Sequence, residues 1–188
     1  MKKRTFNTIK IISGYLKGRN ITLINHVYLR PTLHRIRETL FNWIEKKIYN
    51  ANCLDCFSGS GALSIESISR YAKYVTLIEN NKKILNNIKK NIKKLNIQNI
   101  EILNVNALVW LKKTYQKYDI IFLDPPYYNN ILQKSITIID KNNLIKNTGY
   151  IYIEKDKKKN IHYPKTWYIH KKKSTSNIDY SIYIYRNE

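Results

Sequence analysis

The feature that most constrains the fold is an alternation of short apolar runs with amphipathic stretches through most of the chain. Runs rich in isoleucine, leucine, valine and tyrosine predict strands, and apolar residues three or four positions apart predict helices. Repeated strand–helix units imply an open, mostly parallel sheet with helices on both faces, an α/β fold of the Rossmann-like type. The expected strands cover residues 52–57, 74–79, 100–103, 118–124 and 150–153, and the expected helices cover residues 62–71, 81–95, 107–115 and 130–140.

The N-terminal part departs from this alternation. Residues 9–24 have the pattern of a β-hairpin, with two apolar runs on either side of a glycine-containing turn. Pro31 disfavours helix at the residue before it, and Thr32 is then a suitable N-cap for a helix over residues 33–48.

The tail predicts two further strands, over residues 166–172 and 178–185, which we expect to form an antiparallel pair. The whole pattern predicts a seven-stranded sheet with an antiparallel C-terminal strand. We expect two parts, a hairpin extension over residues 1–29 and the main domain over residues 30–188.

The net charge of +21 and the pI near 9.9 suggest a polyanionic partner. The chain is also crowded with lysine, asparagine, isoleucine and tyrosine, a bias that an AT-rich genome can produce without any selection for binding. The charge therefore supports nucleic acid binding only in combination with a site.

Cys53 and Cys56 form one Cys-x-x-Cys pair, and a structural zinc site needs four ligands. We expect two buried thiols and no metal. No run of about 18 apolar residues occurs, so no membrane span is expected, and the few cysteines fit a cytoplasmic protein.

The segment between the first strand of the alternation and its helix is typical of a cofactor-binding loop. Gly59 and Gly61 let the backbone approach a ligand closely. Ser64 stands where a dinucleotide-binding fingerprint has its third Gly or Ala, so the loop need not bind a pyrophosphate, which argues against NAD.

Two carboxylates complete this site in the sequence. Glu79 ends the next strand, 24 residues after Asp55, close to the spacing at which an acid binds ribose hydroxyls. Two anionic groups would repel a phosphate and suit the sulfonium and ammonium of S-adenosylmethionine. The predicted cofactor residues are Thr32 (for the carboxylate of the cofactor), Asp55, Phe57, Ser58, Gly59, Gly61, Glu79 and Asn106 (for the adenine amino edge).

Residues 124–127 read Asp-Pro-Pro-Tyr and close the strand over residues 118–124. Asp124 can accept a hydrogen bond from an exocyclic amine, and the Pro125 carbonyl is a second acceptor nearby. Tyr127 can stack on a base that has left its helix. We interpret the tetrapeptide as a catalytic site for methyl transfer to a nucleobase nitrogen, the alternative being an ordinary turn.

Three segments together resemble the bacterial 16S ribosomal RNA guanine-N2 methyltransferase family RsmD. They are residues 30–43, which begin Arg-Pro-Thr, residues 53–63, Cys-Leu-Asp-Cys-Phe-Ser-Gly-Ser-Gly-Ala-Leu, and the tetrapeptide 124–127. The resemblance runs from about Lys10 to the C-terminus. It implies a class I methyltransferase fold, S-adenosylmethionine as donor, and the N2 amine of guanine 966 in 16S rRNA as acceptor. The implied partner is the small ribosomal subunit or its assembly intermediate, and we expect a monomer.

One position departs from the family pattern. Tyr71 follows Ser69 and Arg70 where the family usually has glycine. We expect the helix to close differently there, with the chemistry intact.

Basic residues on two segments are candidates for RNA contacts. Arg35 and Arg37 lie on the helix after the Arg-Pro-Thr break and could bind an RNA phosphate or the carboxylate of the cofactor, the alternative being a solvated helix face. Lys10, Lys17 and Arg19 on the hairpin are candidates for the RNA backbone.

Other functions share parts of this pattern. The same tetrapeptide serves adenine-N6 and cytosine-N4 methylation, although DNA enzymes of that kind usually have a target-recognition domain for which this chain has no room. Glutamine methyltransferases of release factors carry Asn where Asp124 stands. A non-catalytic RNA-binding assembly factor with the same fold is a further alternative, against which the intact Asp55, Glu79 and Asp124 argue.

Overall fold

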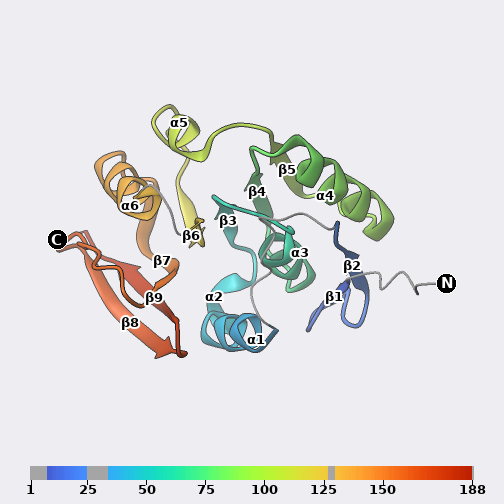
Figure 1. The fold of residues 1–188 in the computed structure, drawn as a ribbon, viewed down its shortest axis with the longest axis horizontal. Coiled ribbons are helices and arrows are strands. Elements are labelled where there is room, and N and C mark those ends of the chain that lie inside the picture. Colours follow the sequence, from blue (N-terminus) through green and yellow to red (C-terminus); the bar gives the residue numbers. More distant parts are fainter. Residues whose placement is uncertain (1–7, 25–33, 127–129, 188) are drawn as a thin grey trace.

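The computed structural model describes residues 8–24, 34–126 and 130–187. Its helices and strands follow one another in the order of the predicted alternation (Figure 1). The strands are β1 (Thr8–Lys10), β2 (Asn20–Thr22), β3 (Asn52–Asp55), β4 (Tyr74–Ile78), β5 (Ile100–Leu103), β6 (Tyr118–Leu123), β7 (Ile145–Asp156), β8 (Trp167–Ser174) and β9 (Ile178–Tyr185). The helices are α1 (His34–Trp43), α2 (Glu45–Ile48), α3 (Ala62–Ser69), α4 (Lys82–Leu95), α5 (Ala107–Leu111) and α6 (Ile131–Lys141).

The described strands form two sheets. β1 and β2 pair as the predicted antiparallel hairpin, and the other seven strands form one sheet in the order β5-β4-β3-β6-β7-β9-β8. The five strands from β5 to β7 are parallel, and β9 is antiparallel to both β7 and β8. The predicted fold class is confirmed. The strand order reverses between β3 and β6, and in open α/β sheets a ligand crevice lies at the carboxyl ends of the strands at such a reversal.

The central strands are buried on both faces, as a parallel sheet between two helical layers requires. Along β6, Ile120 and Phe122 pack into the cluster that contains residues of α1, α3 and α4, while Ile121 and Leu123 pack with residues of α5 and α6. Cys53 and Cys56 are free and buried, as predicted, and belong to different clusters. No helix in the described part of the chain is long and apolar enough to cross a membrane.

Most predicted elements differ from the observed ones by a few residues at their ends, and two of them differ in a way that the sequence explains. The helix predicted over residues 33–48 is divided at Ile44, which has φ −103° and ψ 9° and remains buried, so the apolar face continues across the break. The strand predicted over residues 150–153 is the inner part of the longer β7. Its first half contains polar residues and Thr148 at φ +60°, which hide the strand pattern.

The hairpin packs against the same core as the sheet, next to α3 and α4 (Figure 1). The backbone amides of Ile12 and Ser13 donate hydrogen bonds of 2.8 and 3.0 Å to the buried carboxylate of Glu66 on α3. Arg70 donates to the same carboxylate over 2.9 Å. The hairpin is therefore attached to the helix that begins at the glycine loop.

The C-terminus of α3 corrects the expectation for Tyr71. The Ala72 amide donates to the Ser67 carbonyl at 3.0 Å, and the Tyr71 amide donates to the Ile68 carbonyl at 2.9 Å. These two bonds are the Schellman closure that glycine usually completes. Tyr71 adopts the required left-handed conformation, with φ +65°, so the helix closes in the ordinary way and the expected local change is wrong.

Candidate active site

Three acidic residues follow adjacent strands at one edge of the sheet. Asp55 ends β3 and pairs in register with Leu77 of β4 and Phe122 of β6. Glu79 and Asp124 each lie two residues beyond those partners. Because adjacent strands are about 5 Å apart, Glu79 and Asp124 flank Asp55 on its two sides.

Asp55 is almost completely buried, with 2% of its surface exposed. Burial raises its pKa from 3.8 to about 6, against the opposing effect of a 2.6 Å hydrogen bond that the Ser64 hydroxyl donates to its carboxylate. The Ser58 hydroxyl donates to the Asp55 carbonyl at 3.2 Å. Ser64 stands where a dinucleotide-binding fingerprint has its third Gly or Ala. In this structure its hydroxyl instead donates a hydrogen bond to Asp55, the first acid of the site.

The glycine loop turns sharply over the end of β3. The Gly61 amide donates to the Ser58 carbonyl at 2.7 Å, and the Ser58 amide donates to the Ile78 carbonyl at 3.1 Å. Gly59 and Gly61 have φ of +51° and +76°. A Cβ placed on Gly59 would meet no atom within 4 Å, so the backbone there faces open space where a ligand can approach.

Glu79 connects the glycine loop to the next strand and helix. Its carboxylate accepts hydrogen bonds from the amides of Gly59 (3.1 Å) and Asn81 (2.7 Å). Asn106 is exposed and caps α5, where its side-chain oxygen accepts a 3.2 Å hydrogen bond from the Val109 amide. Its amide NH₂ is the part of the side chain suited to a ligand acceptor.

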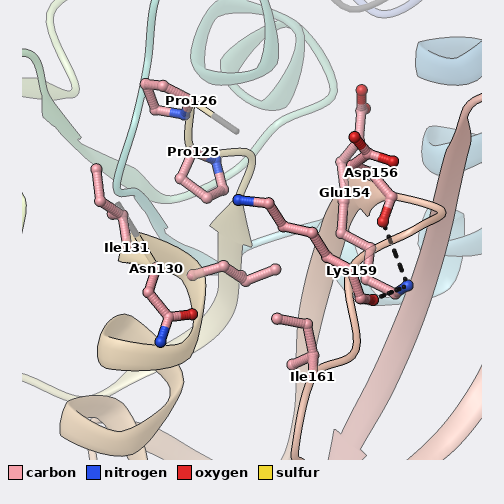
Figure 2. Close-up of a pocket in the computed structure, with 10 residues that line it drawn as sticks. Pro125, Pro126, Asn130, Ile131, Glu154, Asp156, Lys159 and Ile161 are labelled. Carbon is pink, nitrogen blue, oxygen red and sulfur yellow. Dashed lines mark hydrogen bonds between the residues drawn. The ribbon is translucent and has the colours of Figure 1, made fainter. Parts of the chain in front are cut away.

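The other side of the edge is formed by the turn after β6. Asp124 is half-buried, Pro125 is buried and Pro126 is exposed. Pro125 and Pro126 line a pocket together with the start of α6 and the end of β7 (Figure 2). Two predicted site residues, Thr32 and Tyr127, lie outside the described residues. Phe57 is half-buried and packs against the cluster that contains Ile121.

The predicted RNA-contacting residues separate into two groups. Lys10, Lys17, Arg19 and Arg35 are exposed. Arg37 is only 1% exposed: it donates a 3.1 Å hydrogen bond to the Lys10 carbonyl and lies 3.9 Å from the Glu66 carboxylate. A guanidinium in this position cannot reach an RNA phosphate, so the assignment of Arg37 to substrate binding is corrected to a structural role.

The sequence held a signal for the burial of Arg37. It lies one residue after Ile36 and three before Leu40, both fully buried, and therefore falls on the apolar face of α1. Sequence analysis did not predict Glu154 and Lys159 at the pocket beside Pro125. Lysine runs after a strand are common in this chain, and no local pattern distinguishes Lys159 from its neighbours.

The pattern of acids does not suggest a metal centre. Among residues 8–24, 34–126 and 130–187, no three His, Cys, Asp or Glu side chains are grouped closely enough to hold a metal ion. The donor set instead combines carboxylates, backbone amides and an open glycine, which fits an organic ligand with hydroxyl and cationic groups.

The chain is similar to known proteins over nearly its full length. A family model described as Conserved hypothetical protein 95 matches residues 9–184. The chain is 53% identical over 182 residues to ribosomal RNA small subunit methyltransferase D of Buchnera aphidicola subsp. Acyrthosiphon pisum, covering 96% of this chain and 95% of that protein. It is 36% identical over 176 residues to the Escherichia coli K12 protein of the same name, covering 93% and 89%.

Solved structures agree with these relatives. A structure from E. coli of yhhF, named as a candidate methyltransferase, superposes with a TM-score of 0.90 at 35% identity, covering 97% of this chain and all of that one. A tRNA m1G37 methyltransferase from M. jannaschii has a TM-score of 0.70 at 20% identity, a likeness of fold alone; it covers 100% of this chain and 59% of that one. The family model and the relatives above show that this chain belongs to the ribosomal RNA small subunit methyltransferase D family of methyltransferases.

Proposed function

We propose that this protein transfers a methyl group from S-adenosylmethionine to the N2 amine of a guanine in 16S rRNA, guanine 966 by the family resemblance. The observation that carries the proposal is the position of the Asp124–Pro125 turn directly beside the glycine loop. The two motifs follow adjacent strands, β6 and β3, at the reversal of strand order. Donor and acceptor sites therefore share one edge of the sheet.

The cofactor side of this edge fits S-adenosylmethionine by its chemistry. Glu79 presents a carboxylate suited to ribose hydroxyls, and Asp55 lies beside it as a second acid. Gly59 leaves open space where the ligand must approach the backbone. Bound there, the cofactor supplies an electrophilic methyl group on a sulfonium.

Residues on the acceptor side of this edge make the N2 amine of guanine more nucleophilic. The lone pair of the guanine N2 amine is delocalised into the ring, which makes the amine a poor nucleophile. The Asp124 carboxylate and the Pro125 carbonyl accept hydrogen bonds from the two amine hydrogens and hold the nitrogen in a pyramidal form with its lone pair localised. Positive charge develops on this nitrogen as it accepts the methyl group, and a carboxylate already in place stabilises it without reorganisation. The charge is removed when one amine hydrogen leaves as a proton to Asp124 or to water. Tyr127 stacks on the base that has left its helix.

The exposed basic residues supply the affinity for RNA. Lys10, Lys17, Arg19 and Arg35 are exposed and can neutralise phosphates, on a chain whose net charge is +21. The substrate in this proposal is the small ribosomal subunit or its assembly intermediate, methylated in the cytoplasm by a monomer. Binding should weaken steeply as salt is raised, because each neutralised phosphate releases counterions.

The experiment is methyl transfer to small subunits that lack this modification. Asp124→Ala is expected to lower turnover by at least about 100-fold while the Kd for S-adenosylmethionine changes by less than about threefold. The matched control is Glu45→Gln, which removes an exposed acid of α2 at the opposite ends of the strands and should leave turnover unchanged.

Analysis of the modified nucleosides separates the alternatives. N2-methylguanosine is the expected product. N6-methyladenosine would indicate an adenine methyltransferase. No transfer together with no binding of S-adenosylmethionine would indicate a non-catalytic assembly factor. Near-normal turnover by Asp124→Ala would contradict the assigned role of this carboxylate.

A further inference from the structure

Three exposed tyrosine rings form a row at the end of α3 that lies away from the glycine loop. Tyr71 follows this helix, and its ring centroid lies 5.7 Å from that of Tyr15 in the hairpin turn and 6.4 Å from that of Tyr49 after α2. The exposed fractions are 50% for Tyr15, 56% for Tyr71 and 73% for Tyr49. The proposed methyl transfer uses none of these rings, so the active site does not explain their exposure.

The tyrosine row (Tyr15, Tyr71 and Tyr49) is held by hydrogen bonds between the backbones of three segments. The hairpin, the end of α3 and the residues after α2 meet there (Figure 1). The Tyr15 amide donates a 2.9 Å hydrogen bond to the Ser69 carbonyl, and the Asn50 amide donates one of 2.9 Å to the Tyr71 carbonyl. The three rings are therefore presented from defined positions of the folded chain.

The exposed part of the tyrosine row is large enough to be a binding surface. At about 200 Å² for each side chain, the three residues leave roughly 350 Å² in contact with solvent. A continuous patch of this size is in the range that is often functional on soluble proteins. The ring planes are tilted by 40° and 54° to one another, so the rings do not cover each other face to face.

The surroundings of the tyrosine row are basic. Burial, and then Tyr71, raise the pKa of Tyr15, while Arg19 lies close enough to lower it. The Arg19 guanidinium also donates to the Lys94 carbonyl at 3.4 Å, which brings the last turn of α4, with Lys93 and Lys94, beside the hairpin. Residues 13–19, 45–50 and 71–74 carry the row and include one acid and five basic residues: Lys17, Arg19, Lys46, Lys47 and Lys73.

Exposed rings among cations match the two parts of an unpaired RNA strand. Its bases stack on aromatic side chains, and cations neutralise its phosphates. A second copy of this surface would bring like charges together, which disfavours self-association here. We infer that the tyrosine row docks an unpaired stretch of the RNA substrate by base stacking. The inference rests on the proposed function and adds a contact surface roughly one length of α3, about 12 Å, from the glycine loop.

A contact at this distance should act on binding and leave the chemical step unchanged. Tyr49 precedes β3 and Tyr71 precedes β4, so the row lies at the amino ends of strands whose carboxyl ends carry the proposed cofactor site. Loss of the rings should therefore raise KM for small subunits and keep kcat within about twofold of the wild type, as expected when uniform binding is removed.

The test measures Kd by fluorescence anisotropy for an unstructured single-stranded RNA and for an RNA duplex of the same length. The ring variant combines Tyr49→Ser with Tyr71→Asn, because asparagine tolerates the left-handed backbone at position 71. It should bind the single strand about 10- to 100-fold more weakly, since stacked bases are lost, and bind the duplex like the wild type. Tyr49→Phe combined with Tyr71→Phe keeps the rings and should bind both RNAs like the wild type.

The salt dependence of binding separates stacking from charge. The ring variant should keep the wild-type slope of log Kd against log salt, because it removes no cation. Lys17→Gln should instead lower that slope by about 0.7 for the single strand. The matched control is Tyr115→Ser, which removes an 89% exposed ring between α5 and β6 and should bind both RNAs like the wild type. An unchanged Kd for S-adenosylmethionine shows that the ring variant is folded.

Each other outcome assigns the row differently. If the ring variant binds the single strand as tightly as the wild type, the row does not dock RNA and the inference is refuted. Normal RNA binding with a raised KM only on assembled subunits would assign the row to a protein partner. Self-association that the ring variant abolishes would assign it to a second copy, and either result overturns the inference. A wild type that binds RNA but transfers no methyl group to guanine would refute the proposed function, and the binding measurements would still decide the role of the row.

Discussion

Helix α3 contacts a loop at each of its ends, and the two contacts use glycine for opposite reasons. At the N-terminal end, Gly59 has φ +51° and open space where a side chain would begin. Near the C-terminal end, Gly14 of the hairpin has φ +80°, and a Cβ there would lie 1.7 Å from the Ser69 carbonyl oxygen. One glycine leaves room for a ligand, and the other lets two segments of backbone touch.

The buried acids at the two ends of α3 also differ, in how fully hydrogen-bond donors compensate their negative charge. Glu66 accepts three hydrogen bonds, from Ile12, Ser13 and Arg70, and its burial is matched by these donors. Burial raises the pKa of Asp55 to about 6, even though its carboxylate accepts hydrogen bonds from the Ser64 hydroxyl and the Phe57 backbone amide, which lower that pKa. The hairpin end is therefore optimised for stability, while the glycine-loop end keeps an incompletely compensated acid beside the proposed cofactor site, a common conflict between stability and function.

Replacing Glu66 should have the largest effect on stability. Glu66→Gln removes the negative charge beside Arg70 and Arg37, whose guanidinium groups stay largely buried. The expected loss is about 3–5 kcal/mol in the free energy of unfolding, measured by urea denaturation, because buried cations lose their partner. The exposed Glu38→Gln on α1 is the control and should change stability by less than about 0.5 kcal/mol. A loss below about 1 kcal/mol for Glu66→Gln would show that the network adds little.

The paired variants Gly14→Ala and Gly59→Ala compare the two ends directly. Both place alanine in the left-handed region, at about 1–2 kcal/mol each. Gly14→Ala adds a clash with the Ser69 backbone and should lose about 3–4 kcal/mol in total. Gly59→Ala should lose only the about 1–2 kcal/mol of stability that the left-handed conformation costs, but it should weaken the binding of S-adenosylmethionine. Stability is measured by denaturation without ligand. If Gly14→Ala and Gly59→Ala then have equal free energies of unfolding, the contrast between the two ends of α3 is wrong.

The glycine-loop end of α3 is built from contiguous motifs, and the sequence could therefore predict it. The glycine loop and the Asp-Pro-Pro turn are contiguous motifs that each follow a strand, and the position of that strand in a parallel sheet places them at the same edge. Their geometry therefore follows from local sequence and one topological rule. At this edge Asp55 follows β3, and Glu79 and Asp124 follow the neighbouring strands β4 and β6 on its two sides.

Contacts between distant segments could not be predicted in this way. Arg35 and Arg37 have similar local sequence, yet Arg37 is buried because the Lys10 carbonyl, 27 residues earlier, and Glu66 cover it. Lys159 lines the same pocket as Pro125 and Pro126 because the loop after β7 lies beside the start of α6. In both cases the partners of a basic residue depend on which segment folds over it. The helical period indicates that Arg37 is on the buried face of α1, but neither that period nor a lysine run identifies the distant segment.

Asp55 should give a pH-dependent difference in stability. Its folded pKa of about 6 lies above its ordinary value of 3.8, so between these values the folded state holds more protons and stability falls as pH rises. Above pH 6 the full penalty applies, about 3 kcal/mol, since a tenfold change in proton affinity is worth about 1.4 kcal/mol.

Asp55→Asn removes this penalty and keeps an acceptor for Ser64. Its stability relative to the wild type should therefore increase by about 2.5 kcal/mol between pH 4 and pH 7.5, while it binds S-adenosylmethionine more weakly. Urea denaturation at several pH values checks the first effect and calorimetry the second. A stability difference that stays constant with pH would mean that Asp55 does not retain its proton on folding.

The smallest expected effect concerns Tyr71, at the end of α3 that holds the hairpin. Its left-handed conformation costs about 1–2 kcal/mol relative to glycine. Its ring lies 5.7 Å from that of Tyr15 and 6.4 Å from that of Tyr49, and such pairs return about 0.5–1.5 kcal/mol each. Because Tyr71 is more than half exposed, these contacts should lie at the lower end of that range. Tyr71→Gly should therefore change the free energy of unfolding by less than about 1 kcal/mol, since glycine also adds entropy to the unfolded chain.

Tyr71→Asn separates the two contributions, because asparagine tolerates the left-handed region and has no ring to pack against the tyrosines. A clear gain in stability for both variants would mean that backbone strain dominates at this helix end. A clear loss for both would mean that the aromatic contacts, which connect the hairpin turn through Tyr15 to α3, outweigh the strain. In that case tyrosine stands here in place of glycine because its ring stabilises the contact between the hairpin and α3. Glu66 and Gly14 stabilise the same contact at this end of the helix.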